Sequence, residues 1–278
     1  MEVISEKGGY PMKPSYNFMN SNDLFSKVVF FIVIIMLFFL CFQLGVNLIM
    51  YIFSDKRVVH LVDGMKTAVD MQVIHQNPSI QPNKIITRSI NERNGIELSW
   101  SLWLNISNST FRFTTQDKHI FHKGNNNIQP NGVNRPNNAP GLYIDRNTND
   151  IHVYMSTFSR YDESFTIHNV PIDLWFHLVI RVKDRNVDVY VNGNIVTRHV
   201  LSDIPKQNYG NVYVNANGGF DGFLSDLVYY REALSPFEIR SITKSGPNKT
   251  MKSSNTMSVF PPYLSTQWFL FNNPIKDN

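Results

Sequence analysis

Few residues of this chain have the types and the spacing that catalysis requires. A retaining glycoside hydrolase, for example, needs two carboxyl groups about 5 Å apart on one face of a cleft. Asp162 and Glu163 are adjacent, so in a strand their side chains point to opposite faces, and Glu97 has no acidic partner two positions further on. The single cysteine, Cys41, lies in a hydrophobic stretch, and the chain contains no Gly-x-Ser-x-Gly motif. The sequence therefore predicts a protein that is not an enzyme.

The spacing of the histidines gives equally little support to a zinc site. His119 and His122 are three residues apart, which places them on opposite faces of a strand, and no cysteine or third ligand lies nearby. We expect two ordinary surface histidines. Nucleic acid is excluded as a partner, because the net charge is only +4 and the basic residues are spread along the chain.

Binding chemistry has better candidates. Recognition of a sugar requires an aromatic ring beside planar polar groups, which together fit the apolar face and the hydroxyls of the sugar. The segment Arg160, Tyr161 and Asp162 supplies both kinds of group, and Asn125 and Asn217 supply further amides from polar loops. We take these five residues as candidate ligand-binding residues. The alternative is that each belongs to a solvated loop without a ligand.

Short strands must hold these loops in place. From residue 84 to about residue 243, β-type runs alternate with Asn, Gly, Asp and Pro, a pattern typical of an all-β sandwich or barrel. Within residues 176–182 every second residue is apolar, which indicates a strand with one buried face. Asn192 and Gly193 separate two β-type runs and predict a tight hairpin, because both central residues of a type I′ turn need positive φ.

A short helix is predicted after the last strand. Ser235 is the expected N-cap, Pro236 the first helical residue, and Glu238 the third residue of a capping box. Leu234 is expected to pack against Ile239 across the helix start. One helix after a long series of strands is an unusual combination.

An apolar stretch near the N-terminus predicts a single transmembrane helix over residues 28–53, preceded by a polar tail at 1–27. The stretch has no charged residue, and about 20 apolar residues suffice to span a bilayer. It is too long for the hydrophobic region of a signal peptide and lacks a small-residue cleavage site. A buried core helix is seldom so apolar on all its faces.

The orientation of this helix stays open. Two lysines flank its N-terminal side, and three basic residues flank its C-terminal side, a difference of one charge. Asn105, Asn108 and Asn248 stand in glycosylation triplets and would be usable if the C-terminal part were lumenal or extracellular.

The remaining segments carry weaker signals. Residues 54–83 are interpreted as a stalk, and residues 244–278 as a polar linker followed by an aromatic tail. A cysteine count of one rules out an intramolecular disulfide. Asparagine makes up about one residue in nine, well above its usual share, which hints at an AT-rich coding sequence.

Five sequence blocks together resemble a known family. They are Gly95–Trp103, Leu174–Val179, Val189–Gly193, Gly219–Leu227 and Ala233–Ile239. In this order and spacing they resemble laminin-G-like domains of the concanavalin A-like lectin/glucanase superfamily, over residues 84–243. The segment Arg88–Glu92 is similar to membrane-anchored versions in large DNA viruses.

The resemblance implies an antiparallel jelly-roll sandwich of two curved sheets, with Trp103, Trp175, Asn192 and Gly193 serving the fold. Glucanases of the superfamily carry a Glu-x-Asp-x-x-Glu run on one strand, and this chain has none. Some laminin-G-like domains bind calcium at the rim of the sandwich, which makes calcium the one cofactor to consider. Its candidate oxygen donors here are Asp145, Asp162 and Asp221.

Two non-enzymatic functions follow. The first is a structural component of a virion membrane, whose sandwich links the bilayer to a shell or to neighbouring structural proteins. The alternative is a membrane-tethered recognition or adhesion module that binds a glycan or a protein. Fold alone does not decide between them.

Overall fold

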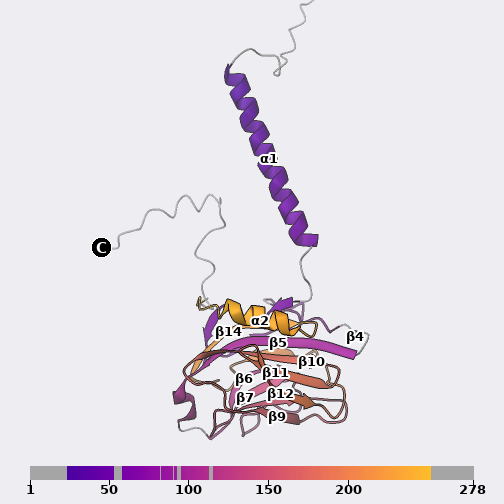
Figure 1. Cartoon of the computed structure of the whole chain (residues 1–278), viewed down its shortest axis with the longest axis vertical. Helices are drawn as coiled ribbons and strands as arrows, with labels where there is room; N and C mark the ends of the chain where they lie inside the picture. Colours follow the sequence, from indigo (N-terminus) through magenta and orange to yellow (C-terminus); the bar gives the residue numbers. More distant parts are fainter. Residues whose placement is uncertain are drawn as a thin grey trace, which may run out of the picture. The chain divides into compact units, whose positions relative to one another are not determined.

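The computed structural model describes residues 24–52, 58–81, 83–89, 91–92, 95–112 and 115–251. The chain divides into two compact units, Met1–Asp55 and Lys56–Asn278. The first unit contains the helix α1 (Leu24–Ile52), and the second contains two β-sheets and a short helix (Figure 1). Most of the predicted N-terminal tail and most of the predicted aromatic tail lie outside the described residues.

Helix α1 confirms the predicted apolar helix. Its segment Lys27–Ile49 has a mean hydropathy of 2.9, and it is long and apolar enough to cross a bilayer. Its apolar side chains are largely exposed within this unit, as Phe31 and Phe38 illustrate. A signal sequence near an N-terminus passes the same test of length and composition.

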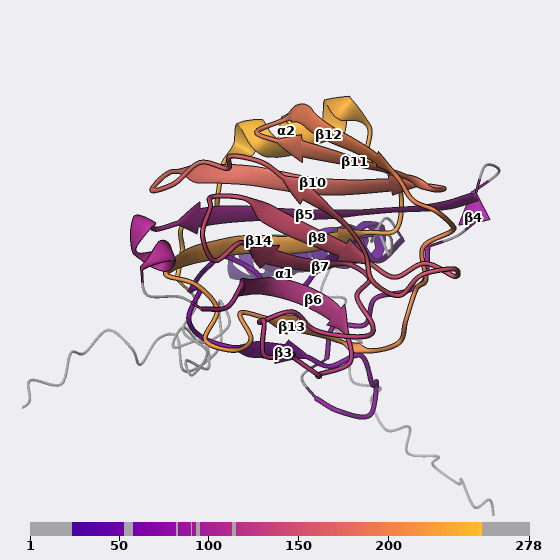
Figure 2. The same cartoon turned by 90° about the horizontal axis from the view of Figure 1, so that it is seen from below.

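The second unit is a sandwich of two antiparallel sheets, as predicted. In the described part of the chain the first sheet has eight strands and the second has six. The first sheet runs in the order β1 (Val58–His60), β14 (Gly222–Tyr230), β5 (Gly95–Ile106), β10 (Trp175–Lys183), β11 (Asn186–Val191) and β12 (Asn194–Val200), with β2 (Met65–Thr67) paired to β14 and β4 (Asn91–Glu92) paired to β5. The second sheet runs in the order β3 (Gln72–Ile74), β13 (Asn211–Val214), β6 (Lys118–Gly124), β7 (Gly141–Ile144), β8 (Ile151–Met155) and β9 (Glu163–Ile167) (Figure 2).

Alternation along the strands builds the core. Phe176, Leu178, Ile180 and Val182 of β10 are all fully buried between the sheets, which confirms the predicted apolar face. Every second residue of β5 joins them, from Ile96 to Ile106. The sandwich therefore forms around one continuous core.

The predicted hairpin and helix are both confirmed. Asn192 and Gly193 join β11 to β12 with φ of 49° and 79°. Helix α2 (Pro236–Ser245) has Ser235 as its N-cap and a complete capping box with Glu238. Buried Leu234 and Ile239 pack with Val179 and Tyr190 on the outer face of the first sheet, where Figure 1 shows α2.

The predicted stalk is wrong for the described residues 58–81. Strands β1, β2 and β3 belong to the sandwich: β1 and β2 pair with β14, and β3 pairs with β13. Leu61, Val62, Ala68 and Ile74 are buried in the shared core. These three-residue strands are too short to show a periodic pattern in the sequence.

The strand registers define two ends of the sandwich. At one end, which we call the rim end, β6 ends beside the start of β13, because Gly124 pairs with Asn211. Strand β8 also ends there beside the start of β9, through the pair Met155 and Glu163. The rim end thus carries three loops that join these strands, at residues 125–140, 156–162 and 201–210. The opposite end carries the loops 145–150 and 215–221.

Candidate functional site

The predicted ligand-binding residues fall at both ends of the sandwich. Arg160, Tyr161 and Asp162 lie in a loop at the rim end, and Asn125 lies there at the end of β6. Asn217 lies at the opposite end, where its amide donates to Gln116 at 2.9 Å. Since β6 separates the two ends, Asn217 does not belong with the other four.

Asn125 is committed to holding its own loop together. Its Nδ2 donates to the carbonyl oxygen of Arg135 at 2.9 Å, and its Oδ1 accepts the backbone N–H of Asn137 at 3.2 Å. The guanidinium of the same Arg135 forms an ion pair with Asp162 at 3.5 Å, so loop 125–140 and loop 156–162 are linked. Asn125 therefore helps to hold loop 125–140 together, and Asp162 links this loop to loop 156–162.

Exposed aromatic rings distinguish the rim end. Phe158 is 65% exposed, Tyr161 is 53% exposed and Tyr209 is 78% exposed. The Lys206 ammonium lies 5.4 Å from the centre of the Phe158 ring, and the Arg88 guanidinium lies 5.6 Å from that of Tyr209. We call Phe158, Tyr161 and Tyr209 the aromatic rim. Two of its three rings thus carry a cation on one face.

Backbone pairing joins the two loops that present the aromatic rim. The N–H of Phe158 donates to the carbonyl of Ile204 at 3.1 Å, and the N–H of Lys206 donates to that of Ser156 at 2.8 Å. Segment 201–210 then continues from this contact to β13, past the ends of β7 and β6. This crossing separates Tyr209 from Phe158 by about three strand spacings, roughly 14 Å.

A buried carboxylate fixes these loops. Glu163 accepts the backbone N–H of Ser202 at 2.7 Å and its hydroxyl at 2.6 Å, and its Oε2 also accepts the Thr157 hydroxyl at 3.4 Å. Burial opposes ionisation, but the two hydrogen bonds from Ser202, together with the His199 ring 3.5 Å away, outweigh it and hold the pKa of Glu163 below its usual value. Glu163 therefore has a structural role in holding these loops.

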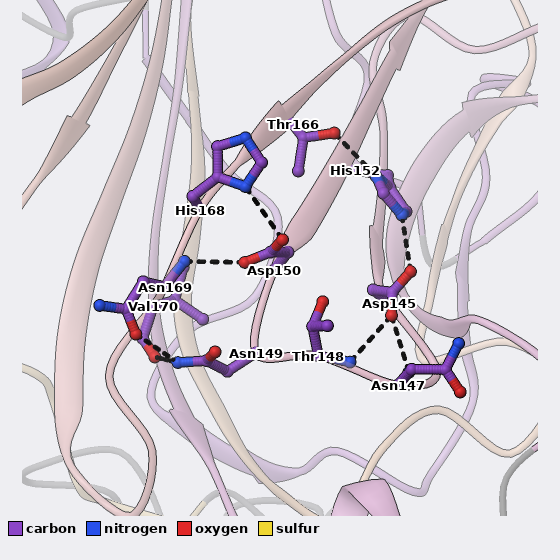
Figure 3. A network of polar contacts seen from close by, with 10 residues as sticks. All are labelled: Asp145, Asn147, Thr148, Asn149, Asp150, His152, Thr166, His168, Asn169 and Val170. Atoms are coloured by element: carbon purple, nitrogen blue, oxygen red, sulfur yellow. Dashed lines mark hydrogen bonds and ion pairs between the residues drawn. The ribbon is translucent and has the colours of Figure 1, made fainter.

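The calcium candidates do not gather. Asp145 lies at the opposite end from the rim, where one oxygen accepts the N–H groups of Asn147 and Thr148 and the other lies 3.0 Å from His152 (Figure 3). Asp162 is paired with Arg135, and Asp221 is exposed on the loop before β14. Among the described residues, no group of three His, Cys, Asp or Glu side chains lies close enough to hold a metal ion.

The prediction of two surface histidines on opposite faces is wrong. His119 and His122 are both buried, and His119 Nε2 lies 2.6 Å from His122 Nδ1. A β-bulge between His119 and Phe121 inserts one extra residue and returns His122 to the face of His119. His119 also accepts the N–H of Ala216, and His122 donates to the carbonyl of Asn125, so both rings link strands as neutral groups. Burial lowers the pKa of His122 to about 4.

The glycosylation triplets differ in exposure. Asn108 and Asn248 are exposed, whereas Asn105 is half-buried in β5. Two of the residues that the resemblance assigns to the fold make contacts inside the domain. Trp103 is 6% exposed and stacks on His177, with ring centres 4.9 Å apart, and Asn192 Oδ1 accepts the backbone N–H of His177. These positions agree with the fold roles that the resemblance implies.

A pocket beside Tyr209 involves residues that the sequence analysis did not select. It has a volume of about 260 Å³ and is lined by, among others, Arg88, Trp100, Lys123 and Tyr209. Neither residue type signals a site by itself, because tryptophan is common in a core and lysine is mostly exposed. The one available signal was that Lys123 stands two positions after the apolar Phe121 and so shares its inward face.

A comparison with protein families identifies the class of the sandwich. A family model described as the concanavalin A-like lectin/glucanases superfamily matches residues 83–240. This range is more than half of the 278 residues, and the chain therefore belongs to this superfamily. The finding confirms the laminin-G-like resemblance. No curated protein sequence matches the chain.

Solved structures of botulinum neurotoxin receptor-binding domains are similar in fold. The domain of serotype D has 14% identity and a TM-score of 0.46, over 69% of this chain and 52% of that one. The serotype D ligand-binding domain in complex with N-acetylneuraminic acid gives 15% and 0.45, over 69% and 51%. The serotype G domain gives 12% and 0.44, over 68% and 50%. The chain thus spans about half of each of these domains. The comparisons do not support the narrower resemblance to proteins of large DNA viruses.

Proposed function

We propose that this chain is a non-enzymatic recognition module, anchored to a membrane by α1, whose sandwich binds a glycan at the aromatic rim. One observation carries the proposal. Three exposed aromatic rings stand on two loops that their neighbours hold rigidly, and planar polar groups lie beside them. Aromatic faces stack on the apolar face of a sugar, while guanidinium and amide groups bond its hydroxyls. Membership of a superfamily of lectins and glucanases agrees with this use.

The buried carboxylates support binding over hydrolysis. Glu163 is occupied by the Ser202 backbone and hydroxyl. Asp188 is occupied by Arg181 at 2.9 Å and by Arg198 at 2.6 Å. Hydrolysis requires one carboxyl group that can donate a proton beside a second that is free to react. Ion pairs and hydrogen bonds keep Asp188 and Glu163 from either role.

The glycan proposal is tested with full-length protein in lipid nanodiscs on a glycan array. Tyr209→Ala and Tyr161→Ala are expected to weaken binding at least tenfold, about 1.4 kcal/mol. Phe237→Ala is the matched control, because Phe237 is 83% exposed on α2 and lies outside the rim. Equal losses in all three variants, or no glycan whose binding depends on Tyr209, would contradict the proposal.

Anchoring by α1 is tested separately in sealed microsomes. We expect the chain to resist extraction at alkaline pH, as an integral membrane protein does, and to keep its full length. Protease protection together with an endoglycosidase gel shift at Asn108 and Asn248 then reports the side on which the sandwich lies. Release into the soluble fraction, or loss of α1 by cleavage, would contradict the anchor.

A structural role in a virion membrane remains the second hypothesis. It shares the anchor and the sandwich with the proposal above. No described residue and no comparison favours it over glycan recognition, so the recognition module is the function that we put forward.

A further inference from the structure

The pocket at the rim end has mainly apolar walls. Ile85, Ile86, Leu98, Trp100 and Tyr229 line it, together with more polar residues at its mouth. It opens where β5 begins and β6 ends, between the two sheets. A cavity of about 260 Å³ is close to the size of sites that hold a small organic molecule.

One wall contains a hydrogen-bond donor without a partner. Trp100 is 1% exposed, and its Nε1–H has no acceptor among the described residues. The ring is fixed by Phe121 and Tyr229, whose ring centres lie 5.1 Å and 5.0 Å away. A buried donor without an acceptor is unfavourable, so a ligand that places an acceptor beside this N–H would bind more tightly.

A second wall contains a buried cation. Lys123 is 6% exposed, and its Nζ donates to the carbonyl of Gly210 at 2.7 Å. Within the described part of the chain, no carboxylate lies within ion-pair distance of this ammonium. Burial lowers the pKa of Lys123 to about 8, so it is still mostly charged at pH 7. Buried charges are normally paired, and this one has only a neutral oxygen.

The mouth adds positive charge and no negative charge. The Arg88 guanidinium rests over Tyr209, and no Asp or Glu is found among the described residues that line the pocket. The walls therefore offer donors and cations to a ligand, without a carboxylate that would repel an anion.

Hydrogen bonds hold one wall of the pocket in place. Gln76 accepts the N–H of Ile86 at 2.8 Å and donates to the carbonyl of Lys84 at 2.8 Å. Gln207 exchanges two hydrogen bonds with Ser89, at 3.2 Å and 2.6 Å. The two glutamines hold the wall segment 83–89 at both ends, so little ordering is required on binding.

We propose that this pocket binds a small amphipathic carboxylate, with its apolar body against Trp100 and Tyr229 and its carboxylate facing Lys123 and the indole N–H. The carboxylate supplies the hydrogen-bond acceptor that Trp100 lacks and a negative charge to pair with the Lys123 ammonium. Tyr209 at the mouth of the pocket also belongs to the aromatic rim. The contacts proposed here are with Trp100, Lys123 and Tyr229, which are not rim residues, so the proposal does not depend on glycan binding.

Calorimetry on the full-length protein in nanodiscs tests this with three probes. 4-Phenylbutyrate combines an apolar body with a carboxylate, 4-phenylbutyramide has the same shape without the charge, and glucuronate puts the carboxylate on a polar ring. We expect 4-phenylbutyrate to bind at least tenfold more tightly than either of the others. On its addition, the Trp100 indole N–H resonance should shift. Equal binding of the acid and the amide, equal binding of glucuronate, or no binding of the acid would overturn the proposal.

Variants separate the pocket from the general surface charge. Lys123→Met removes the cation at nearly the same length, and Trp100→Phe removes the N–H. Each is expected to weaken binding of the acid at least tenfold. Lys123→Met should leave the weak binding of the amide unchanged, whereas Trp100→Phe should weaken it too, because the amide oxygen accepts the same N–H. Lys206→Met is the matched control, because Lys206 is a cation of the rim end that does not line the pocket. An equal loss in Lys206→Met would overturn the proposal. If one pocket variant fails to fold by circular dichroism, the other decides.

The chain's own tail is the competing occupant. A chain ending at residue 251 is measured beside the full-length protein. If 4-phenylbutyrate and 4-phenylbutyramide bind with equal affinity, and bind only after residues 252–278 are removed, the pocket is a binding site for that aromatic tail. The proposal then fails.

Discussion

Acidification from pH 7 to pH 5 should lower the free energy of unfolding of the sandwich, and His177 should account for about 2 kcal/mol of the loss. His177 is fully buried between the first sheet and α2. Its Nε2 lies 2.8 Å from the Ser101 hydroxyl, and its Nδ1 lies 2.7 Å from the Thr243 hydroxyl. Because Thr243 donates its own proton to the carbonyl of Ile239, Nδ1 carries the hydrogen, and Nε2 accepts the Ser101 hydroxyl when the ring is neutral.

The magnitude follows from the pKa. Burial lowers the pKa of His177 from 6.5 to about 4, so the unfolded chain takes up a proton more readily than the folded one. The stability is fully present above pH 6.5, falls as the pH drops below 6.5, and levels off below about 4. One pKa unit corresponds to about 1.4 kcal/mol, so the full loss is about 3 kcal/mol, and about 2 kcal/mol of it is reached at pH 5.

Urea unfolding of residues 56–278, followed by circular dichroism at both pH values, measures this loss. His177→Gln is destabilised at both, but its difference between pH 7 and pH 5 should be about 2 kcal/mol smaller than in the unsubstituted chain. Thr243→Val is the control, since it removes the hydrogen bond and keeps the titrating ring. The remaining acid sensitivity is assigned to His119 and His122, whose pKa values burial also lowers. The reasoning is refuted if His177→Gln keeps the full difference.

Three further outcomes are expected. A chain of residues 84–251 should fail to fold, whereas residues 56–251 should fold. The shorter chain lacks Leu61, Val62 and Ile74, whose burial stabilises the fold by about 2 kcal/mol each. Equal circular dichroism spectra of the two chains would contradict this. Glu163→Gln should lower the free energy of unfolding by about 1–3 kcal/mol and loosen loop 201–210, which urea titration and hydrogen exchange check; unchanged exchange in that loop would count against its role. Ser235→Ala should cost about 1 kcal/mol through the lost N-cap, measured in the same titration, whereas Ser241→Ala on the exposed side of α2 should cost far less.

Features with a local physical cause were predicted correctly from the sequence. The alternation along β10 follows from the pleat, which sends successive side chains to opposite faces. The Asn192–Gly193 turn follows from the backbone freedom of those two residues, and the start of α2 follows from Ser235 and Glu238. Each of these signals lies within a few residues of the structure that it specifies.

Features that depend on distant partners were missed. Strands β1 to β3 have only three residues each, and they become strands because β14 and β13 supply their hydrogen bonds. The histidine pair was misplaced because a one-residue bulge reverses the face on which His122 lies. A bulge leaves no mark in the apolar pattern when both neighbours, Ile120 and Phe121, are apolar and buried.

The candidate site was found only in part for the same reason. Tyr161 was selected from the sequence as a candidate ligand-binding residue, and the structure places it exposed at the rim end. Tyr209 was not selected, because its loop contacts residues 156–158 only after the chain has passed from one sheet to the other. Lys123 is buried, and its Nζ bonds to the carbonyl of Gly210, 87 residues later in the chain, which a strand pattern does not reveal.

The pairing of β1 with β14 also determines how late in translation β1 can find its partner strand. Val58 pairs with Tyr230, about 170 residues later in the chain. At about 5–20 residues per second, the residues after α1 wait roughly 10–30 s for their partner to be made. During that interval Leu61 and Val62 have no core to enter, and the edge of β1 is open to other strands. The nascent chain therefore requires protection for as long as translation of the sandwich lasts, and slow codons before β14 would lengthen the time during which it can aggregate.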